Sequence, residues 1–342
     1  MRISLQLRNG LVLLMAALAV SCVSTQPAAP GALVKRPIWP LPPDEPRLEY
    51  VKSIRGPADI GQSPSVWHRV SNWVTGDTGE AMNLQKPFGV ALDETGNLCL
   101  TDTGAGAVCY CDFVHKKWKR WEAVDKERFK SPVAVARRDG IFYVADSEWG
   151  KVVAFRDNGK KVFEISTPLQ RPAGLAVASD ALVVADSQAH TIFVFDLQGK
   201  LRFQFGTRGA GPGEFNFPTH VGVDGQGHLL ITDSMNARIQ VFTPDGKFIS
   251  EIGSSGDTSG HFGRPKGAAA DTYGHIYVAD AVFNNVQVFD LNGQLLLTLG
   301  EAGAEPGQFG LPNGIAIDGT NQIYITDCYN RRVQVLKYIG QP

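Results

Sequence analysis

The sequence lacks a large excess of charge of either sign. It has 33 Lys and Arg residues against 34 Asp and Glu residues, so the formal net charge is −1. A nearly neutral chain has no overall field that would attract nucleic acid or an anionic membrane surface. We therefore expect no nucleic-acid partner, and any partner must be recognised by local groups.

The sequence also lacks the short motifs of common catalytic sites. It contains no G-x-S-x-G, Walker loop, H-E-x-x-H or dinucleotide fingerprint in a supporting context. The glycine-rich stretch 206–214 joins two predicted strands and opens no helix, so it is not a phosphate loop. The residues give no positive evidence for an enzyme, for catalytic residues or for a cofactor.

No long hydrophobic run is present at the N-terminus. The apolar run Leu11–Val20 has ten residues, about half of what a bilayer-spanning helix needs. Basic residues precede it and Cys22 follows, which predicts a signal peptide over residues 1–21. Leu18–Cys22 resembles the lipobox of bacterial lipoproteins, although Ala19 replaces the usual leucine. The resemblance implies lipidation of Cys22; the alternative is ordinary cleavage nearby, with Cys22 lost or left free.

The residue after the cysteine bears on location. Val23 stands where an Asp would be expected in an inner-membrane lipoprotein, so the resemblance implies an anchor in the outer membrane, facing the periplasm or the cell surface. Residues 23–46 hold seven prolines and predict an extended tether over residues 22–46. A folded domain is predicted over residues 47–338.

A short helix is predicted over residues 64–75. Ser63 would cap it, Pro64 would start it and Gly76 would end it. Its apolar residues are spaced by three and four, so they share one face. We expect this face to pack on the side of the folded domain; the alternative is contact with a membrane or a partner.

One phrase recurs six times between Asp102 and Asp327, a β-rich run that ends in a small residue and Asp. The closing aspartates are Asp102, Asp146, Asp186, Asp233, Asp280 and Asp327. Their intervals are 44, 40, 47, 47 and 47 residues. A proline recurs upstream of each aspartate, at Pro87, Pro132, Pro172, Pro218, Pro265 and Pro312. Such a period indicates a repeat array.

Each unit contains four β-rich bursts separated by Gly, Asp and Asn turns, which is typical of a four-stranded propeller blade. The fold class is therefore all-β, a six-bladed β-propeller with repeats over 85–336. The last repeat ends after three strands, whereas residues 47–54 read as an unassigned strand. We expect this N-terminal strand to complete the last blade and close the ring.

The repeat resembles the NHL family over about residues 85–336. Three linkers carry the family's long phrase, at residues 206–218, 253–265 and 300–312. The first three units are more degenerate, with Ala134 at a usual glycine position and with Arg137 and Arg138 in place of the first-strand aspartate. The resemblance implies a bacterial lipoprotein member with NHL-type blades.

The repeated aspartates could suggest a ring of reactive carboxylates. Each ends a strand and enters a turn, where a carboxylate suits the local backbone amides. A cation follows five residues later in three units, as Asp146 with Lys151, Asp233 with Arg238 and Asp327 with Arg332. We therefore expect hairpin-bracing pairs, with no metal or acid-base role.

His220 interrupts a row of small residues that lie two positions after each proline. In the amidating lyases that share the fold, several histidines hold an axial zinc, and such a site needs about three ligands. The other histidines of this chain do not occupy equivalent positions. We expect a structural or ligand-contacting His220 and no metal.

Five cysteines are present. Cys99 could form a disulfide with Cys109 or Cys111 across the first hairpin, since an exported protein permits disulfides. A three-thiol metal site is the alternative. No C-x-x-C-H motif is present, which excludes covalent haem.

The loops before the first strand and after the second strand of each blade share one face of a propeller. We expect this face to bind a protein, peptide or glycan of the envelope. The protein would then be a monomeric scaffold tethered to the membrane. A metal-dependent lyase or lactonase-like hydrolase with an axial site is the alternative. The predicted face comprises Phe88, Glu148, Trp149, His190, Thr219, His220, Lys266, Phe283, Asn313, Tyr329, Asn330 and Arg331.

Overall fold

The computed structural model describes residues 36–62 and 82–340. The predicted signal peptide, the lipidation site Cys22 and the predicted helix 64–75 lie outside these residues. Within the described ranges, no helix is long and apolar enough to cross a bilayer. Strands dominate the described residues, which also include the short 3₁₀ turns η1 (Pro57–Ile60) and η3 (Ser234–Asn236).

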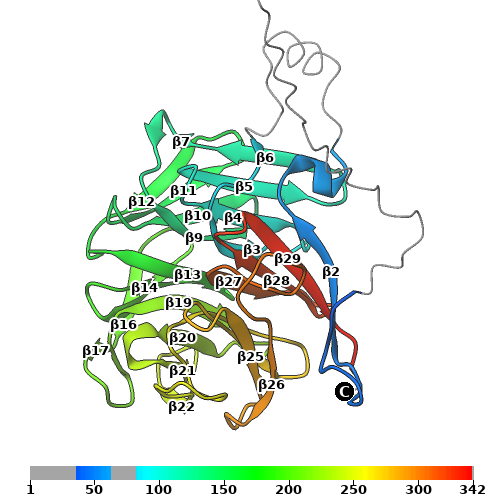
Figure 1. Ribbon diagram of the computed structural model, residues 1–342. Coiled ribbons are helices and arrows are strands. Elements are labelled where there is room, and N and C mark those ends of the chain that lie inside the picture. Colours follow the sequence, from blue (N-terminus) through cyan, green and yellow to red (C-terminus); the bar gives the residue numbers. More distant parts are fainter. Residues whose placement is uncertain (1–35, 63–81, 341–342) are drawn as a thin grey trace, which may run out of the picture. The chain divides into compact units, whose positions relative to one another are not determined.

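Five antiparallel sheets of four strands follow one another along the chain (Figure 1). The first three blades are β3 (Pro87–Leu92), β4 (Leu98–Asp102), β5 (Ala107–Asp112) and β6 (Lys117–Trp121); β9 (Pro132–Arg138), β10 (Ile141–Asp146), β11 (Lys151–Arg156) and β12 (Lys161–Ile165); and β13 (Pro172–Ala178), β14 (Ala181–Asp186), β15 (Thr191–Asp196) and β16 (Leu201–Phe205). The next two blades are β19 (Pro218–Val223), β20 (Leu229–Asp233), β21 (Arg238–Phe242) and β22 (Phe248–Ile252); and β23 (Pro265–Ala270), β24 (Ile276–Asp280), β25 (Asn285–Phe289) and β26 (Leu295–Leu299).

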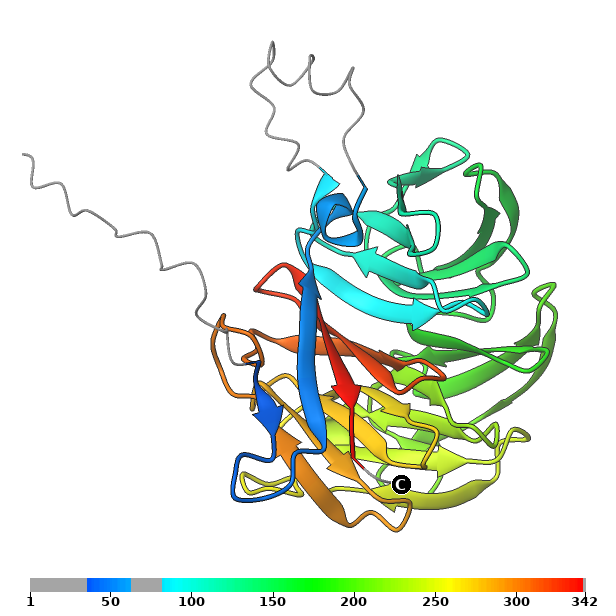
Figure 2. The same ribbon diagram turned by 90° about the vertical axis from the view of Figure 1, so that its right-hand side faces the viewer.

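The sixth blade joins the two ends of the chain. It contains β27 (Pro312–Ile317), β28 (Gln322–Asp327), β29 (Arg332–Tyr338) and the N-terminal strand β2 (Leu48–Ile54). Figure 2 shows β2 in blue beside β29 in red. The two strands pair antiparallel, with Leu48 opposite Tyr338 and Ile54 opposite Val333. The predicted closing strand is confirmed.

The inner strands form a closed ring. Each of β3, β9, β13, β19, β23 and β27 contacts the next, and β27 contacts β3. Second strands such as β10 are almost wholly buried, because both of their faces meet neighbouring blades, whereas the outer β12 is mostly exposed. This pattern explains the continuous apolar phrases that repeat along the sequence. The six-bladed fold class is confirmed.

A fifth strand lies outside β2 in the last blade. Strand β1 (Ile38–Trp39) pairs antiparallel with β2, and Trp39 packs against the apolar cluster of blades five and six. The sequence predicted an extended tether over residues 22–46. The structure instead places two residues of this range, Ile38 and Trp39, in strand β1. The sheet reaches back to residue 38 because the open edge of β2 accepts a further strand.

The repeated proline and aspartate lie directly opposite each other in every blade. Pro87 pairs with Asp102, and the same pairing recurs through to Pro312 with Asp327. The strand register shifts next to each of these pairs. Such a bulge re-aims the neighbouring side chains, and at least one neighbour of each proline lines the axial cavity at the loop face.

Glycine two positions after the proline lets the inner strands approach closely. A Cβ on Gly267 would lie 2.6 Å from the carbonyl oxygen of Asn313, and one on Gly314 would lie 2.7 Å from that of Phe88. No side chain fits against a neighbouring backbone at that distance. The close packing at the axis therefore depends on these glycines.

The three long linkers are held by a buried glutamine on the third strand of blades four to six. Each glutamine accepts a linker N–H at its Oε1 and donates from its Nε2 to a linker carbonyl, over 2.6 to 2.9 Å. The residues are Gln240, Gln287 and Gln334. In each linker a phenylalanine is also fully buried, at Phe215, Phe262 and Phe309. The linkers are thus fixed parts of the fold, and in one of them β17 (Thr207–Arg208) pairs with β18 (Glu214–Phe215).

Candidate binding site in the axial channel

The six repeated aspartates serve the backbone. All are buried, with at most 1% of each residue exposed. Asp186 accepts N–H groups of Gln170 and Arg171 from the preceding linker and of Gln188 and Ala189 from the following turn, over 2.7 to 3.1 Å. Asp233 and Asp327 differ, because each accepts one linker N–H and its other donors are side chains. The carboxylate therefore fastens the linker to the loop at the mouth of the ring, as the turn position predicted.

Two of the three predicted cation pairs form. Arg238 Nε lies 2.9 Å from Asp233, and Arg332 Nε lies 2.7 Å from Asp327. The third prediction is wrong, because Lys151 pairs with Glu127 and Glu164. Asp146 is already occupied by four backbone N–H groups, two from the linker and two from the turn.

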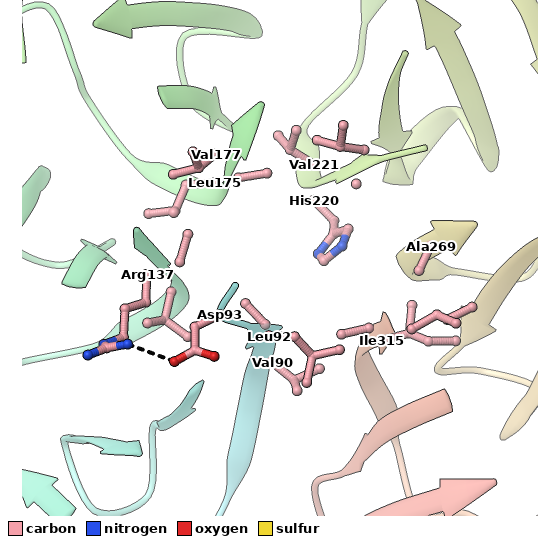
Figure 3. Close-up of a pocket in the computed structure, with 18 of the residues that line it drawn as sticks. Val90, Leu92, Asp93, Arg137, Leu175, Val177, His220, Val221, Ala269 and Ile315 are labelled. Carbon is pink, nitrogen blue, oxygen red and sulfur yellow. Dashed lines mark hydrogen bonds and ion pairs between the residues drawn. The ribbon is translucent and has the colours of Figure 1, made fainter. Parts of the chain in front are cut away.

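Two cavities lie within the ring of inner strands, and His220 lines both. The first, the inner cavity, has a volume of about 450 Å³ and takes apolar residues from all six first strands, such as Leu175 and Ile315. Arg137 Nη1 forms an ion pair with Asp93 Oδ2 at 2.7 Å on its wall. Figure 3 shows this pair and the ring of His220, which points into the cavity.

The second cavity, the mouth cavity, opens on the loop face and has a volume of about 420 Å³. Its walls follow the repeat, because they come from residues beside each proline and from residues that follow three of the six aspartates. They are Phe88, Val133, Ser147, Arg171, Ala173, Ser187, Phe217, Thr219, His220, Ser234, Met235, Arg264, Lys266 and Asn313.

Five predicted face residues line the mouth cavity, namely Phe88, Thr219, His220, Lys266 and Asn313. The sequence interpretation missed Arg171, Phe217 and Arg264, which precede their prolines directly. The sequence does indicate these residues, because all three stand at the same position of the repeat, directly before the proline. This position was overlooked because, next to each proline, only the residues on its C-terminal side were assigned to the face.

The other predicted face residues lie in the loops outside this cavity. Tyr329 is 67% exposed, whereas Trp149 packs on Phe129 and under the ammonium group of Lys151. Arg331 and Asn330 line a separate outer pocket. Glu148 and Phe283 belong to the turns after Asp146 and Asp280, where their backbone N–H groups bind those carboxylates.

Two predicted face residues have structural contacts. His190 is buried, and its Nδ1 lies 3.2 Å from both the carbonyl oxygen of Phe215 and the amide nitrogen of Phe217. Asn330 donates from Nδ2 to Asp327 and to the carbonyl of Gly303. Both side chains therefore hold a linker in place.

Burial within the channel controls the ionisation of His220. Desolvation lowers its pKa to about 4, and a hydrogen bond to the backbone of Ala268 opposes that shift. The imidazole is therefore neutral near pH 7. A neutral ring can donate one hydrogen bond and accept another.

Lys266 is the other group with a perturbed pKa in the mouth cavity. Desolvation lowers its pKa to about 8, and the charge of Arg264 lowers it further, against smaller opposing effects of Cys328 and Asp280. Strongly perturbed ionisable groups in a cleft are candidates for a functional site.

The predicted disulfide is wrong. Cys99 lies opposite Tyr110, while Cys109 and Cys111 lie opposite Leu100 and Leu98. Cys99 therefore points to the apolar cluster shared with blade two, and the other two point to the cluster shared with blade six. Cys99, Cys109, Cys111 and Cys328 are free and buried.

The described residues do not fit a metal centre. Nowhere in residues 36–62 and 82–340 do three His, Cys, Asp or Glu side chains gather as ligands. His220 shares the mouth cavity with the basic residues Arg171, Arg264 and Lys266 and with no carboxylate. This charge repels a divalent cation.

Comparisons with known proteins agree with this architecture. The family described as 6-bladed beta-propeller matches residues 164–229, and the NHL repeat matches residues 309–336. The protein is thus a six-bladed β-propeller. The NHL match falls on the last repeat, in the sixth blade. A search of curated proteins finds no match.

Solved structures with the same fold have different functions. A virginiamycin B lyase from Staphylococcus aureus is 15% identical, with 75% of this chain and 96% of that one covered and a TM-score of 0.55. A gluconolactonase from Xanthomonas campestris is 17% identical, with 75% and 86% covered and a TM-score of 0.57. An auxiliary nutrient binding protein from Bacteroides thetaiotaomicron is 13% identical, with 75% and 70% covered and a TM-score of 0.58. At these identities the likeness shows the fold alone.

Proposed function

We propose that the protein is a binding module that presents its loop face to a protein, peptide or glycan of the bacterial envelope. The supporting observation is an open cavity at the centre of that face, surrounded by exposed apolar side chains. Phe217, Met235, Val282 and Tyr329 are 43%, 56%, 55% and 67% exposed. The last three occupy the same position, two residues after the aspartate. Apolar groups on a polar rim are typical of interaction sites.

We further propose that the chain is lipidated at Cys22 and held at the outer membrane, facing the periplasm or the cell surface. The lipobox-like sequence supports this location. Several acyl chains anchor a protein stably where one does not. Fractionation of cells that express wild-type protein or Cys22→Ala tests it: the variant should leave the membrane fraction, and retention there would contradict the anchor.

Capture from a crosslinked envelope tests the binding role. The bait is the full chain, and its variants are Met235→Ser and Tyr329→Ser, which change only exposed side chains. Both should reduce recovery of the partner, while Leu201→Ser, an exposed change on an outer strand, serves as the control. Equal recovery with all four baits would overturn the proposed face.

The alternative is a metal-dependent lyase or lactonase-like hydrolase. Its support is the shared fold of the S. aureus lyase and the X. campestris lactonase. The basic lining of the mouth cavity argues against it. Metal analysis of purified protein decides: stoichiometric zinc or calcium that is lost in His220→Ala would favour the alternative over the binding module.

A further inference from the structure

Three basic side chains converge on the mouth cavity without an acidic partner. Arg171, Arg264 and Lys266 line it, and no Asp or Glu is among the lining residues. Within the described part of the chain, none of the three forms an ion pair. By contrast, Arg137, Arg238 and Arg332 are each paired with an aspartate.

The nearest repeat carboxylate is already occupied. Asp280 accepts the backbone N–H groups of Gly263 and Arg264 and of two residues of the following turn. Asp280 is also fully buried. Its role is to hold the linker, and it leaves the positive charge of the cavity largely uncompensated.

The charge on Lys266 is energetically unfavourable in the free protein. Its amine lies in a desolvated place beside Arg264, which lowers its pKa to about 8. A buried or half-buried charge without a partner destabilises the fold. An anionic ligand would supply the missing partner and would favour the protonated amine.

Thr219, one of the residues that line this cavity, has an unused hydrogen-bond donor. Thr219 Oγ1 is buried and has no hydrogen-bond partner. The hydroxyls of Ser187 and Ser234 differ, because they donate to the carbonyls of Arg171 and Pro265. A buried polar atom without a partner is uncommon and calls for a ligand or a water.

We propose that the mouth cavity binds an oxyanion, a carboxylate or a phosphate, which anchors the ligand of this face. The inference rests on the proposed binding function and defines the chemistry of its ligand. Lys266 and Arg264 supply charge-assisted hydrogen bonds, and Thr219 supplies a neutral one. The exposed apolar residues of the rim contact the rest of the ligand.

Binding of two simple anions by the purified full chain tests this inference. Citrate represents the carboxylate and inorganic phosphate the phosphate, each titrated at constant ionic strength against sodium chloride. The readout is the melting temperature, which a ligand of the native state raises. We expect at least one anion to raise it in a saturable way, and the anion that binds more tightly identifies the chemistry.

Variants then locate the site. Lys266→Met should weaken binding about tenfold, and Arg264→Met, which changes an exposed residue, should also weaken it. Thr219→Val should have a smaller effect. Lys200→Met, on a turn between the third and fourth strands of blade three, is the matched control and should bind as wild type. A melting curve of each variant without anion shows that it is folded.

Absence of a saturable response to both anions, or equal responses of wild type and both basic-site variants, would overturn the inference. The proposed function is tested separately by capture from the envelope. If capture depends on Tyr329 but neither anion binds, only the anion proposal is refuted and the proposed binding function stands. If the Met235 and Tyr329 variants capture as much as wild type but the anions still bind, only the proposed envelope partner is refuted.

Discussion

Arg332 Nε donates a hydrogen bond to Asp327 Oδ2 over 2.7 Å, and both side chains are buried. Arg332 also donates to the carbonyls of Glu305 and Gln308 in the preceding linker. Arg332→Leu would leave a buried carboxylate without its cation, so we expect the free energy of unfolding to fall by about 3–5 kcal/mol. Chemical denaturation measures this fall.

The control for this prediction is Arg202→Leu. Arg202 pairs with Asp180 at 2.8 Å on the surface, where water screens the charges. Its loss should leave the free energy of unfolding nearly unchanged. A similar small change for Arg332→Leu would show that the buried pair does not brace the blade.

The sequence predicted the blade count and the closing strand because the repeat is strict in proline and aspartate, which pair across the first two strands. Pairs that depend on neighbouring segments were not predictable. Lys151 meets Glu127 and Glu164, which come from β8 (Glu127–Arg128) and β12. Nothing in the Asp-x5-Lys spacing encodes those neighbours.

The cysteine prediction failed for a similar reason. The hairpin turn sets the register that pairs Asp102 with Ala107 and thereby Cys99 with Tyr110. A shift of one residue would place Cys99 on the face of Cys109 and Cys111. The mouth cavity differs, because its lining repeats with the period, and the sequence holds that signal in the residues on either side of each proline.

The closing strand should contribute strongly to stability. Ile54 in β2 is fully buried against blades one and six, so Ile54→Ala should lower the free energy of unfolding by about 2–5 kcal/mol. Lys52→Ala changes an exposed residue of the same strand and should have a small effect. Deletion of residues 47–54 should lower the melting temperature further, and an unchanged midpoint would refute the closure.

Lys266→Met should stabilise the free protein near pH 7. The pKa of Lys266 in the folded state is about 8, below the 10.5 of an unperturbed lysine. Between these values the unfolded chain binds more protons, so wild-type stability rises with pH across this window. The variant should be more stable by about 1–3 kcal/mol below pH 8, with allowance for partial exposure.

The difference between Lys266→Met and wild type should shrink from pH 8 upward and disappear above pH 10.5. Denaturation curves at several pH values measure it, with Lys200→Met as the reference for loss of a surface charge. A constant difference across this range would show that Lys266 is not desolvated in the folded state.

The buried thiols should react only after unfolding. Burial raises the pKa of Cys109 and of Cys328 to about 12, so their thiolate forms are scarce at pH 8. In the full chain carrying Cys22→Ala, a thiol reagent should react slowly under native conditions. In denaturant without reductant it should detect four thiols. Fewer than four would indicate a disulfide after all.

His220 should govern part of the acid sensitivity of the fold. Its folded pKa of about 4 lies below the 6.5 of an unperturbed histidine, so between these values the unfolded chain takes up a proton that the folded chain does not. Wild-type stability should therefore fall as pH decreases from 6.5 to 4. His220→Asn should show a shallower decrease, and ring resonances of His220 should titrate near pH 4. A ring that titrates near 6.5 would mean that the imidazole is not desolvated in the folded state.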